Sequence, residues 1–266
     1  MHASATDGIQ SRQKVRNDIN GTAFEWPESK IRHPGCAEAV GTTLIPYCLK
    51  SASHAPTAAL IGDSHANSIF DYFDGYFSRQ GRGIIMLGKA GCPPFLMVER
   101  GQSACPEVMS EIVRYLAQNP DIRDVYITGR FAAAQSGRDF GEATKDDFYP
   151  MKLLSKPLEQ GRDEIFRTGF SLMLDALEKS GKRITIVFDV PELDFEPKSC
   201  IRNRNNGQCF IERDKVLARQ AAYREIVASL REKHAFGVAD LMEPFCDKDK
   251  CIAQHEGRIL YRDKHH

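Results

Sequence analysis

The sequence lacks an excess of charge of either sign. Its 266 residues include 36 Lys and Arg and 36 Asp and Glu, so the formal net charge is zero. Such a chain has no long-range field to attract nucleic acid or an anionic membrane surface, and we expect neither as a charge-driven partner. The hydrophobic fraction of 42% is large enough for a packed core and too large for a disordered chain.

Long apolar runs are also missing. No stretch approaches the roughly 20 apolar residues that a membrane helix needs. The first 21 residues are polar and lack the apolar centre of a signal peptide. The sequence contains neither a P-loop nor a G-x-G-x-x-G motif, so we expect no nucleotide, metal or other cofactor in its chemistry.

The eight cysteines indicate an oxidising environment. They occur as close neighbours in sequence: Cys36 with Cys48, Cys92 with Cys105, Cys200 with Cys209, and Cys246 with Cys251. An even number in loops rich in Pro, Gly or charge favours four local disulfides. A zinc site at "CDKDKC" is the alternative, although this spacing is not C-x-x-C and no second motif follows; free cytosolic thiols are the third. Because disulfides require export, we expect an exported domain cut from a longer protein.

Apolar runs alternate with amphipathic segments after an irregular start. Residues 1–55 are expected to form a linker or N-terminal extension that packs on a domain at 56–266. Expected strands cover 57–63, 83–91, 124–131, 182–193 and 236–246, and expected helices cover 68–80, 105–120, 158–181 and 212–235. Residues 132–157 show no period and predict a long surface loop. This alternation predicts an α/β fold, a three-layer α/β/α arrangement with a parallel, doubly wound, flavodoxin-like sheet.

The first apolar run, in "AALIGDSHANSIF", ends in Gly62, Asp63, Ser64 and His65. Ligands of parallel α/β sheets bind at the carboxyl ends of the strands. A helix that begins here offers free N–H groups to a developing negative charge. Ser64 is therefore a candidate nucleophile whose own N–H forms part of an oxyanion hole. The alternative is that Asp63 or Ser64 simply caps the helix.

A serine nucleophile needs a base and a group that orients the base. The neighbouring His65 is a poor candidate because adjacent side chains on a tight turn diverge, so we expect Asp63 and His65 to shape the turn. The final "LYRDKHH" carries Asp263 and His266, three residues apart. On a turn, the carboxylate can reach its own histidine and fix the tautomer, while the other ring nitrogen faces Ser64. The alternative is that the last histidines are disordered or belong to a tag.

Three sequence blocks resemble a known superfamily. "IGDSH" after the first strand, "KAGCPPF" at 89–95 and the final "GRILYRDKHH" are similar to SGNH (GDSL-like) hydrolases. Within this superfamily the blocks look more like one branch, the periplasmic SGNH domain of acyltransferase-3 membrane proteins, which O-acetylate surface polysaccharides such as lipopolysaccharide O-antigen. The resemblance runs from about residue 57 to the end. It implies a periplasmic domain of an inner-membrane protein, a polysaccharide acceptor, and an acyl donor delivered by a fused or associated membrane domain.

The resemblance also implies residue roles. Ser64 matches the family nucleophile, Asp263 and His266 match its D-x-x-H pair, and Gly91 stands where the superfamily keeps an oxyanion-hole glycine. The third block, Gly followed by Asn-Asp, is replaced by "TGRF", so Arg130 occupies the asparagine position. Either Arg130 donates to the oxyanion or substrate, or it forms a structural salt bridge. A missing oxyanion donor costs on the order of 3 kcal/mol of transition-state stabilisation.

Two classes of function stay open at this point. The first is acyl transfer through an acyl-serine intermediate to a sugar hydroxyl, which becomes a carbohydrate acetylesterase activity if water is the acceptor. The second is a non-catalytic carbohydrate-binding domain of a membrane acyltransferase, favoured by the altered third block.

Overall fold

The computed structural model describes residues 36, 38, 40–141, 149–155, 160–202, 209–256 and 258–266. A six-stranded sheet with the order β1-β3-β2-β5-β7-β9 forms its centre. The parallel strands are β2 (Pro56–Gly62), β3 (Gly83–Gly88), β5 (Asp124–Thr128), β7 (Arg183–Phe188) and β9 (Phe236–Asp240). Counted along the chain, they follow the flavodoxin-like order 2-1-3-4-5, so the predicted doubly wound sheet is confirmed. The winding reverses between β2 and β5, where ligands of such folds bind.

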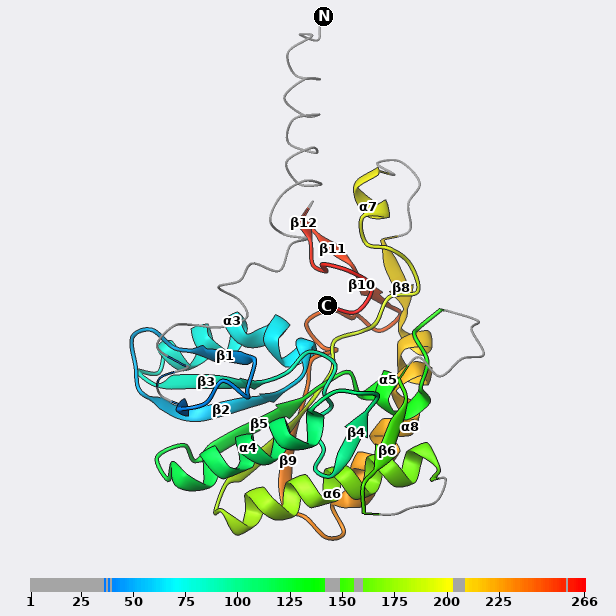
Figure 1. Cartoon of the computed structure of the whole chain (residues 1–266). Coiled ribbons are helices and arrows are strands. Elements are labelled where there is room, and N and C mark those ends of the chain that lie inside the picture. The colour runs from blue at the N-terminus through cyan, green and yellow to red at the C-terminus, as the bar shows by residue number, and fades with distance from the viewer. Residues whose placement is uncertain are drawn as a thin grey trace, which may run out of the picture.

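Helices cover both faces of the sheet (Figure 1). One face carries α3 (Ser64–Ser78), and the other carries α4 (Cys105–Gln118), α5 (Phe131–Ser136), α6 (Arg162–Lys179) and α8 (Arg213–Leu230). Successive side chains of β2 point to opposite faces of the sheet, because a strand is pleated, and they pack in different apolar clusters. Leu60 packs with Phe70 and Phe77 of α3, whereas Ile61 lies in the larger core on the opposite face.

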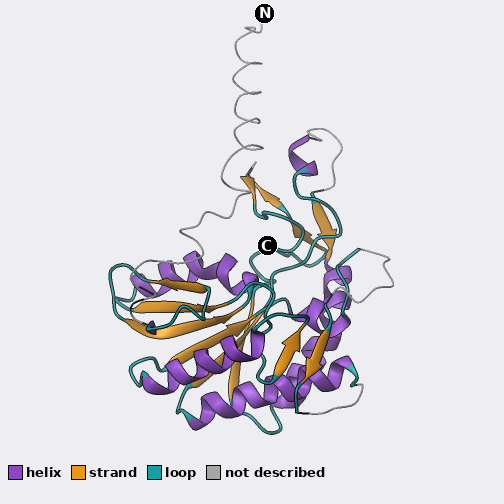
Figure 2. Cartoon of the chain, viewed as in Figure 1, coloured by secondary structure: helices purple, strands orange, loops and turns teal. Residues whose placement is uncertain are grey.

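Short elements stand above the carboxyl ends of the strands (Figure 2). They are α7 (Ser199–Arg202), the pair β8 (Phe210–Glu212) and β10 (Lys250–Ile252), and the pair β11 (Gln254–His255) and β12 (Arg258–Ile259). A third apolar cluster, which includes Leu193, Met242 and Tyr261, anchors them. The C-terminus lies between these elements and α3, beside the carboxyl edge of the sheet (Figure 1).

The sheet begins earlier in the chain than the expected boundary at residue 56. β1 (Tyr47–Lys50) pairs antiparallel with β3 and forms an edge of the sheet, so it is part of the folded unit. Its four residues are too few to show a period in the sequence. The part of the predicted linker that covers residues 1–35 lies outside the described residues.

Other expectations about elements are also wrong in detail. The segment 132–157, expected as a loop, contains most of α5 and all of β6 (Met151–Leu153), which pairs with β4 (Val98–Arg100); residues 142–148 and 156–157 of it lie outside the described residues. The last strand stops at Asp240 because the chain then turns, with the N–H groups of Phe245 and Cys246 donating to the carbonyl of Met242.

All eight cysteines form disulfides. The pairs are Cys36–Cys48, Cys92–Cys105, Cys200–Cys209 and Cys246–Cys251, each as expected from the sequence. The zinc and free-thiol alternatives for these cysteines are therefore not realised in the structure. The Cys92–Cys105 bond ties the loop after β3 to the start of α4, at the carboxyl edge of the sheet.

Candidate active site

The turn after β2 places Ser64 at the first position of α3. Gly62 is needed there because a Cβ atom at this position would lie 1.9 Å from the carbonyl oxygen of Thr128 on the adjacent strand. Asp63 is the N-cap, and its carboxylate accepts hydrogen bonds from the N–H groups of His65 (2.9 Å) and Arg130 (3.0 Å). The backbone N–H of Ser64 is one of the helix-terminal donors that have no intrahelical acceptor.

The last residues of the chain form a closed turn beside this helix. Asp263 accepts hydrogen bonds from the backbone N–H groups of His265 (3.0 Å) and His266 (2.8 Å). The N–H of Arg262 donates to the carbonyl of His266 at 2.7 Å. The N–H of Leu193, in the segment after β7, donates to the carbonyl of Lys264 at 2.7 Å. Backbone hydrogen bonds therefore hold the D-x-x-H segment against the carboxyl edge of the sheet.

The structure brings Ser64, His266 and Asp263 into one hydrogen-bonded chain. Nε2 of His266 lies 2.8 Å from Oγ of Ser64, and Nδ1 of His266 lies 2.8 Å from Oδ2 of Asp263. Burial raises the pKa of the Asp263 carboxyl, but the hydrogen bond and charge of His266 outweigh burial and lower this pKa well below its usual range. An ionised Asp263 accepts the Nδ1–H bond, which leaves the lone pair of Nε2 directed at the hydroxyl of Ser64.

Two other imidazoles surround His266. The ring centroid of His65 lies 4.7 Å from that of His266, and the ring centroid of His265 lies 4.3 Å from it. Burial, with His266 acting in the same direction, lowers the pKa of His65 to about 3. Burial, followed by the charges of Arg130 and His65, lowers the pKa of His265 to about 3. Both rings are therefore neutral near pH 7.

His65 faces an acid that the sequence analysis did not single out. Its Nδ1 lies 2.6 Å from Oδ2 of Asp189, and both side chains are buried. Burial, with the nearby Glu192 acting in the same direction, raises the pKa of Asp189 well above its usual range. The sequence did carry a signal, since Asp189 directly follows β7 at the same edge of the sheet as Ser64.

Arg130 belongs to a buried ion-pair network. Its Nε lies 2.7 Å from Oε1 of Glu192, its guanidinium also contacts Asp139, and Arg219 of α8 contacts the other oxygen of Glu192. These contacts match the expectation that Arg130 forms a structural salt bridge. The role of Arg130 as a donor to an oxyanion or substrate stays a prediction. Because Glu192 precedes Leu193, the network fixes the segment that holds the C-terminal turn.

Replacing Glu192 with glutamine is expected to destabilise the fold by about 3 kcal/mol, because it leaves buried guanidinium groups without their shared carboxylate. Burial raises the pKa of Glu192, but Arg130 and Arg219 outweigh burial and lower this pKa. The carboxylate therefore stabilises the fold fully above about pH 4.3, its unfolded value. This stabilisation is lost as the pH falls through the lowered folded value.

Urea unfolding followed by circular dichroism between pH 3 and pH 7 measures this effect. At pH 7 the free energy of unfolding of the Glu192→Gln variant should be smaller than that of the wild-type protein. Between pH 7 and pH 3 it should then decrease less than that of the wild type. Glu111→Gln is the matched control, because Glu111 pairs with Arg114 on the exposed side of α4 and should change stability little. A Glu192→Gln variant as stable as the wild type at pH 7 would contradict the assignment.

Gly91, the expected oxyanion-hole glycine, lies in the loop after β3 with a φ of +68°. Its carbonyl accepts hydrogen bonds from Nη1 of Arg100 (3.1 Å) and from the hydroxyl of Tyr149 (3.0 Å). This left-handed backbone conformation favours glycine, and a Cβ atom here would also displace the Arg100 guanidinium, which would lie 2.2 Å away. These contacts fix the peptide, and the contribution of its N–H to an oxyanion hole stays a prediction.

A second serine, histidine and acid meet elsewhere in the fold. Oγ of Ser171 lies 2.7 Å from Nε2 of His234, whose Nδ1 lies 3.0 Å from Oε2 of Glu178. Ser171 is in the interior of α6, where intrahelical bonds occupy the backbone N–H groups, so this group has no oxyanion donors of its own. It joins α6 to the segment that follows α8, and Ser171 can serve as a control for Ser64.

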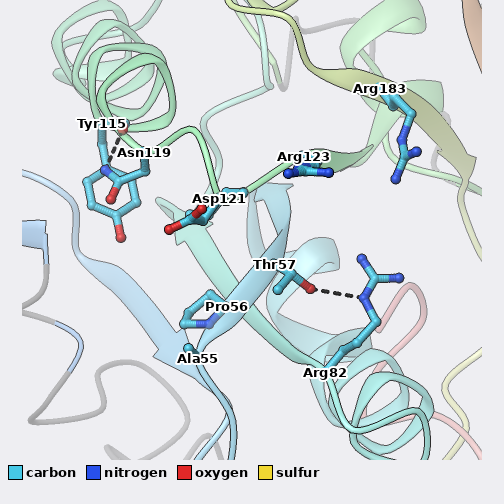
Figure 3. A pocket seen from close by; sticks show the side chains of 10 residues that line it. Ala55, Pro56, Thr57, Arg82, Tyr115, Asn119, Asp121, Arg123 and Arg183 are labelled. Atoms are coloured by element: carbon cyan, nitrogen blue, oxygen red, sulfur yellow. Dashed lines mark hydrogen bonds between the residues drawn. The ribbon is translucent and has the colours of Figure 1, made fainter.

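A cavity of about 570 Å³ lies at the opposite edge of the sheet (Figure 3). Its lining includes Pro56 at the start of β2, Arg82 and Arg183. Both of these arginines pair with the single carboxylate of Asp124, each at 2.6 Å, so Asp124 compensates one of their two positive charges. None of the candidate site residues lines this cavity.

Comparison with known families identifies one match. The family described as "SGNH domain (fused to AT3 domains)" matches residues 35–266, a range that includes β1 and both ends of the candidate site. No curated protein sequence matches the chain. Among the helices of the described residues, none is both long and apolar enough to cross a membrane.

Two solved structures are similar to the chain. The periplasmic domain of a lipopolysaccharide acetyltransferase from Salmonella serovar Paratyphi A superposes with a TM-score of 0.62 at 13% identity, over 99% of this chain and 91% of that one. A protein from Bacteroides fragilis described as a candidate acylhydrolase has a TM-score of 0.38 at 10% identity, over 76% of this chain and 77% of that one. At this identity, the first likeness shows a shared fold.

Proposed function

Because the chain belongs to the family of SGNH domains that are fused to AT3 domains, we propose that it transfers an acyl group through Ser64 to a hydroxyl of a bacterial surface polysaccharide. The observation that carries the proposal is the bond from Ser64 Oγ to Nε2 of His266, whose other nitrogen is held by Asp263. This arrangement supplies a nucleophile, a base and an orienting carboxylate in one chain.

In the first half of the reaction, Ser64 Oγ attacks the carbonyl carbon of an acyl ester. His266 Nε2 takes the hydroxyl proton as the new C–O bond forms, and the carbonyl oxygen becomes an oxyanion. The N–H of Ser64, at the start of α3, stabilises this oxyanion, and the N–H of Gly91 is the second proposed donor. The intermediate collapses, the leaving oxygen takes the proton from His266, and an acyl-serine ester remains.

In the second half, a sugar hydroxyl replaces the leaving group and the steps run in reverse. The hydroxyl gives its proton to His266 Nε2 and attacks the acyl carbon, and Ser64 Oγ leaves and regains a proton from His266. The ionised Asp263 stabilises the imidazolium that forms in each half. Water in place of the sugar gives hydrolysis, so the acceptor decides between transferase and esterase.

The disulfides and the family support a location and a partner. Four disulfides persist in oxidising compartments such as the bacterial periplasm. The family is described by its fusion to AT3 domains, and the similar solved domain from Salmonella is periplasmic. We therefore propose that this domain lies in the periplasm as part of an inner-membrane protein, with an AT3-type membrane domain that delivers the acyl donor.

An acceptor assay tests the proposal. The protein is incubated with an aryl acetate as acyl donor and an O-antigen oligosaccharide as acceptor, and the products are analysed by mass spectrometry. We expect an acetyl group on the sugar and a transient acetyl group on the protein. Acetate release without acetylated sugar would assign an esterase instead, and a protein that never becomes acetylated would support a binding role.

A further inference from the structure

Three imidazoles meet beside Ser64, and the proposed reaction uses one of them. One ring nitrogen from each of His65, His265 and His266 lies within 4.8 Å of the others. Imidazole nitrogen is a preferred ligand of Zn²⁺ and Cu²⁺, and three histidines with one open position make a common zinc site. The ligating nitrogens of a tetrahedral ion bound at about 2.0–2.1 Å lie about 3.4 Å apart, so side-chain adjustment within this 4.8 Å limit would bring the three nitrogens onto one ion.

Aspartate side chains stand behind two of these rings. Nδ1 of His65 lies 2.6 Å from Asp189, and Nδ1 of His266 lies 2.8 Å from Asp263. Metal-binding histidines usually have such a carboxylate behind the ring, because it fixes the tautomer and raises the basicity of the ligating nitrogen. The arrangement therefore contains outer-shell groups of a metal site as well as ligands.

One ring nitrogen of the cluster lacks a partner. Nε2 of His65 is buried and has no hydrogen-bond partner among the described residues, whereas Nδ1 of His265 lies 3.5 Å from Oδ1 of Asp263. The side chain of His65 is only 1% exposed. A buried polar atom without a partner is costly, and an ion is one way to satisfy it.

We propose that His65, His265 and His266 bind a divalent transition-metal ion, such as Zn²⁺, that reversibly inhibits the active site. Both ring nitrogens of His266 are already engaged, one by Ser64 and one by Asp263. A metal must displace one of these partners, and either displacement breaks the chain that activates Ser64. The inhibitory effect rests on the proposed function, whereas metal binding itself does not.

Calorimetric titration with zinc chloride tests binding without reference to activity. We expect one site on the wild-type protein and its loss in His265→Gln, which removes a ligand outside the proposed triad. Asp189→Asn should weaken zinc binding about 10–100-fold, because Asp189 contacts the ring of His65. His255→Gln is the control because His255 is exposed on β11. His234→Gln removes the histidine of the other potential metal-binding group, with Asp175 and Glu178, and should also leave this site intact.

The aryl acetate assay then tests inhibition. Zinc should inhibit the wild-type protein, a chelator should restore activity, and His265→Gln should remain active but need at least about 10-fold more zinc. Absence of zinc binding, or equal zinc sensitivity of the wild type and His265→Gln, would overturn the proposal. If zinc bound but the protein had no Ser64-dependent activity, the metal site would be supported and the proposed function would be rejected.

Discussion

Replacing Ser64 with alanine is expected to reduce acyl turnover by about 10⁴- to 10⁶-fold, because it removes the atom that forms the acyl-enzyme ester. The fold should not change, since Ser64 is partly exposed and Asp63, not Ser64, caps α3. The rate of aryl acetate hydrolysis and the acetylation of the intact protein measure the effect. Circular dichroism and thermal unfolding confirm that the variant folds.

Ser171→Ala is the matched control. Ser171 has the same kind of bond to a histidine and an acid, through His234 and Glu178, but it lies inside α6. If a serine must lie at a helix N-terminus to act as the nucleophile, the Ser171→Ala variant should keep wild-type activity. A serine-directed phosphonate should label Ser64 and leave Ser171 unmodified.

The opposite pattern would reject the proposed mechanism. If Ser64→Ala hydrolysed the ester as fast as the wild-type protein, the activity would arise elsewhere in the chain. If the wild-type protein neither turned over the ester nor reacted with the phosphonate, the hydrogen-bonded chain at Ser64 would not constitute an active site under those conditions.

The proximity of Ser64 to the end of the chain could be predicted from the sequence. The motif "GDSH" follows a short apolar run, so it had to lie at the carboxyl edge of a parallel sheet. The spacing of Asp263 and His266 then suggested a turn in which the acid reaches its own histidine. These patterns place each segment locally. That two segments 202 residues apart meet followed instead from the need of a serine nucleophile for a base and an orienting acid, and from the resemblance to SGNH hydrolases.

The environment of this chain could not be predicted in the same way. The pairing of Arg130 with Glu192, and of His65 with Asp189, joins residues that are far apart in sequence. The partner of each buried acid depends on how the segment after β7 packs against α8. This packing leaves no periodic pattern in the sequence. The expected strand through residue 193 concealed Asp189 and Glu192, because it treated a turn at the sheet edge as part of the strand.

Short elements were missed for a related reason. The strands β4, β6, β8 and β10 contain three residues each, fewer than an alternating pattern needs to be visible. Tertiary contacts define them, as in the pairing of β8 with β10 beside the Cys246–Cys251 disulfide. The elements that could be predicted are long enough for their buried apolar face to appear as a pattern in the sequence.

Replacing Asp263 with asparagine is expected to reduce turnover by about 10⁴-fold while the C-terminal turn persists. The amide oxygen of asparagine can still accept the backbone N–H groups of His265 and His266. Its NH₂ group, however, would donate to Nδ1 of His266 and move the ring proton to Nε2. The imidazole would then present an N–H to Ser64 and could not take the hydroxyl proton.

The steady-state rate of aryl acetate hydrolysis measures this loss, and Asp247→Asn is its matched control. Asp247 accepts two backbone N–H groups, from Asp249 and Lys250, in a turn of the same kind but without a histidine. A turn-stabilising role for Asp263 predicts similar, small effects of both substitutions, because asparagine preserves the backbone bonds. A tautomer-fixing role predicts a large loss in Asp263→Asn alone, with unchanged thermal stability, so equal activities of the two variants would exclude Asp263 from the mechanism.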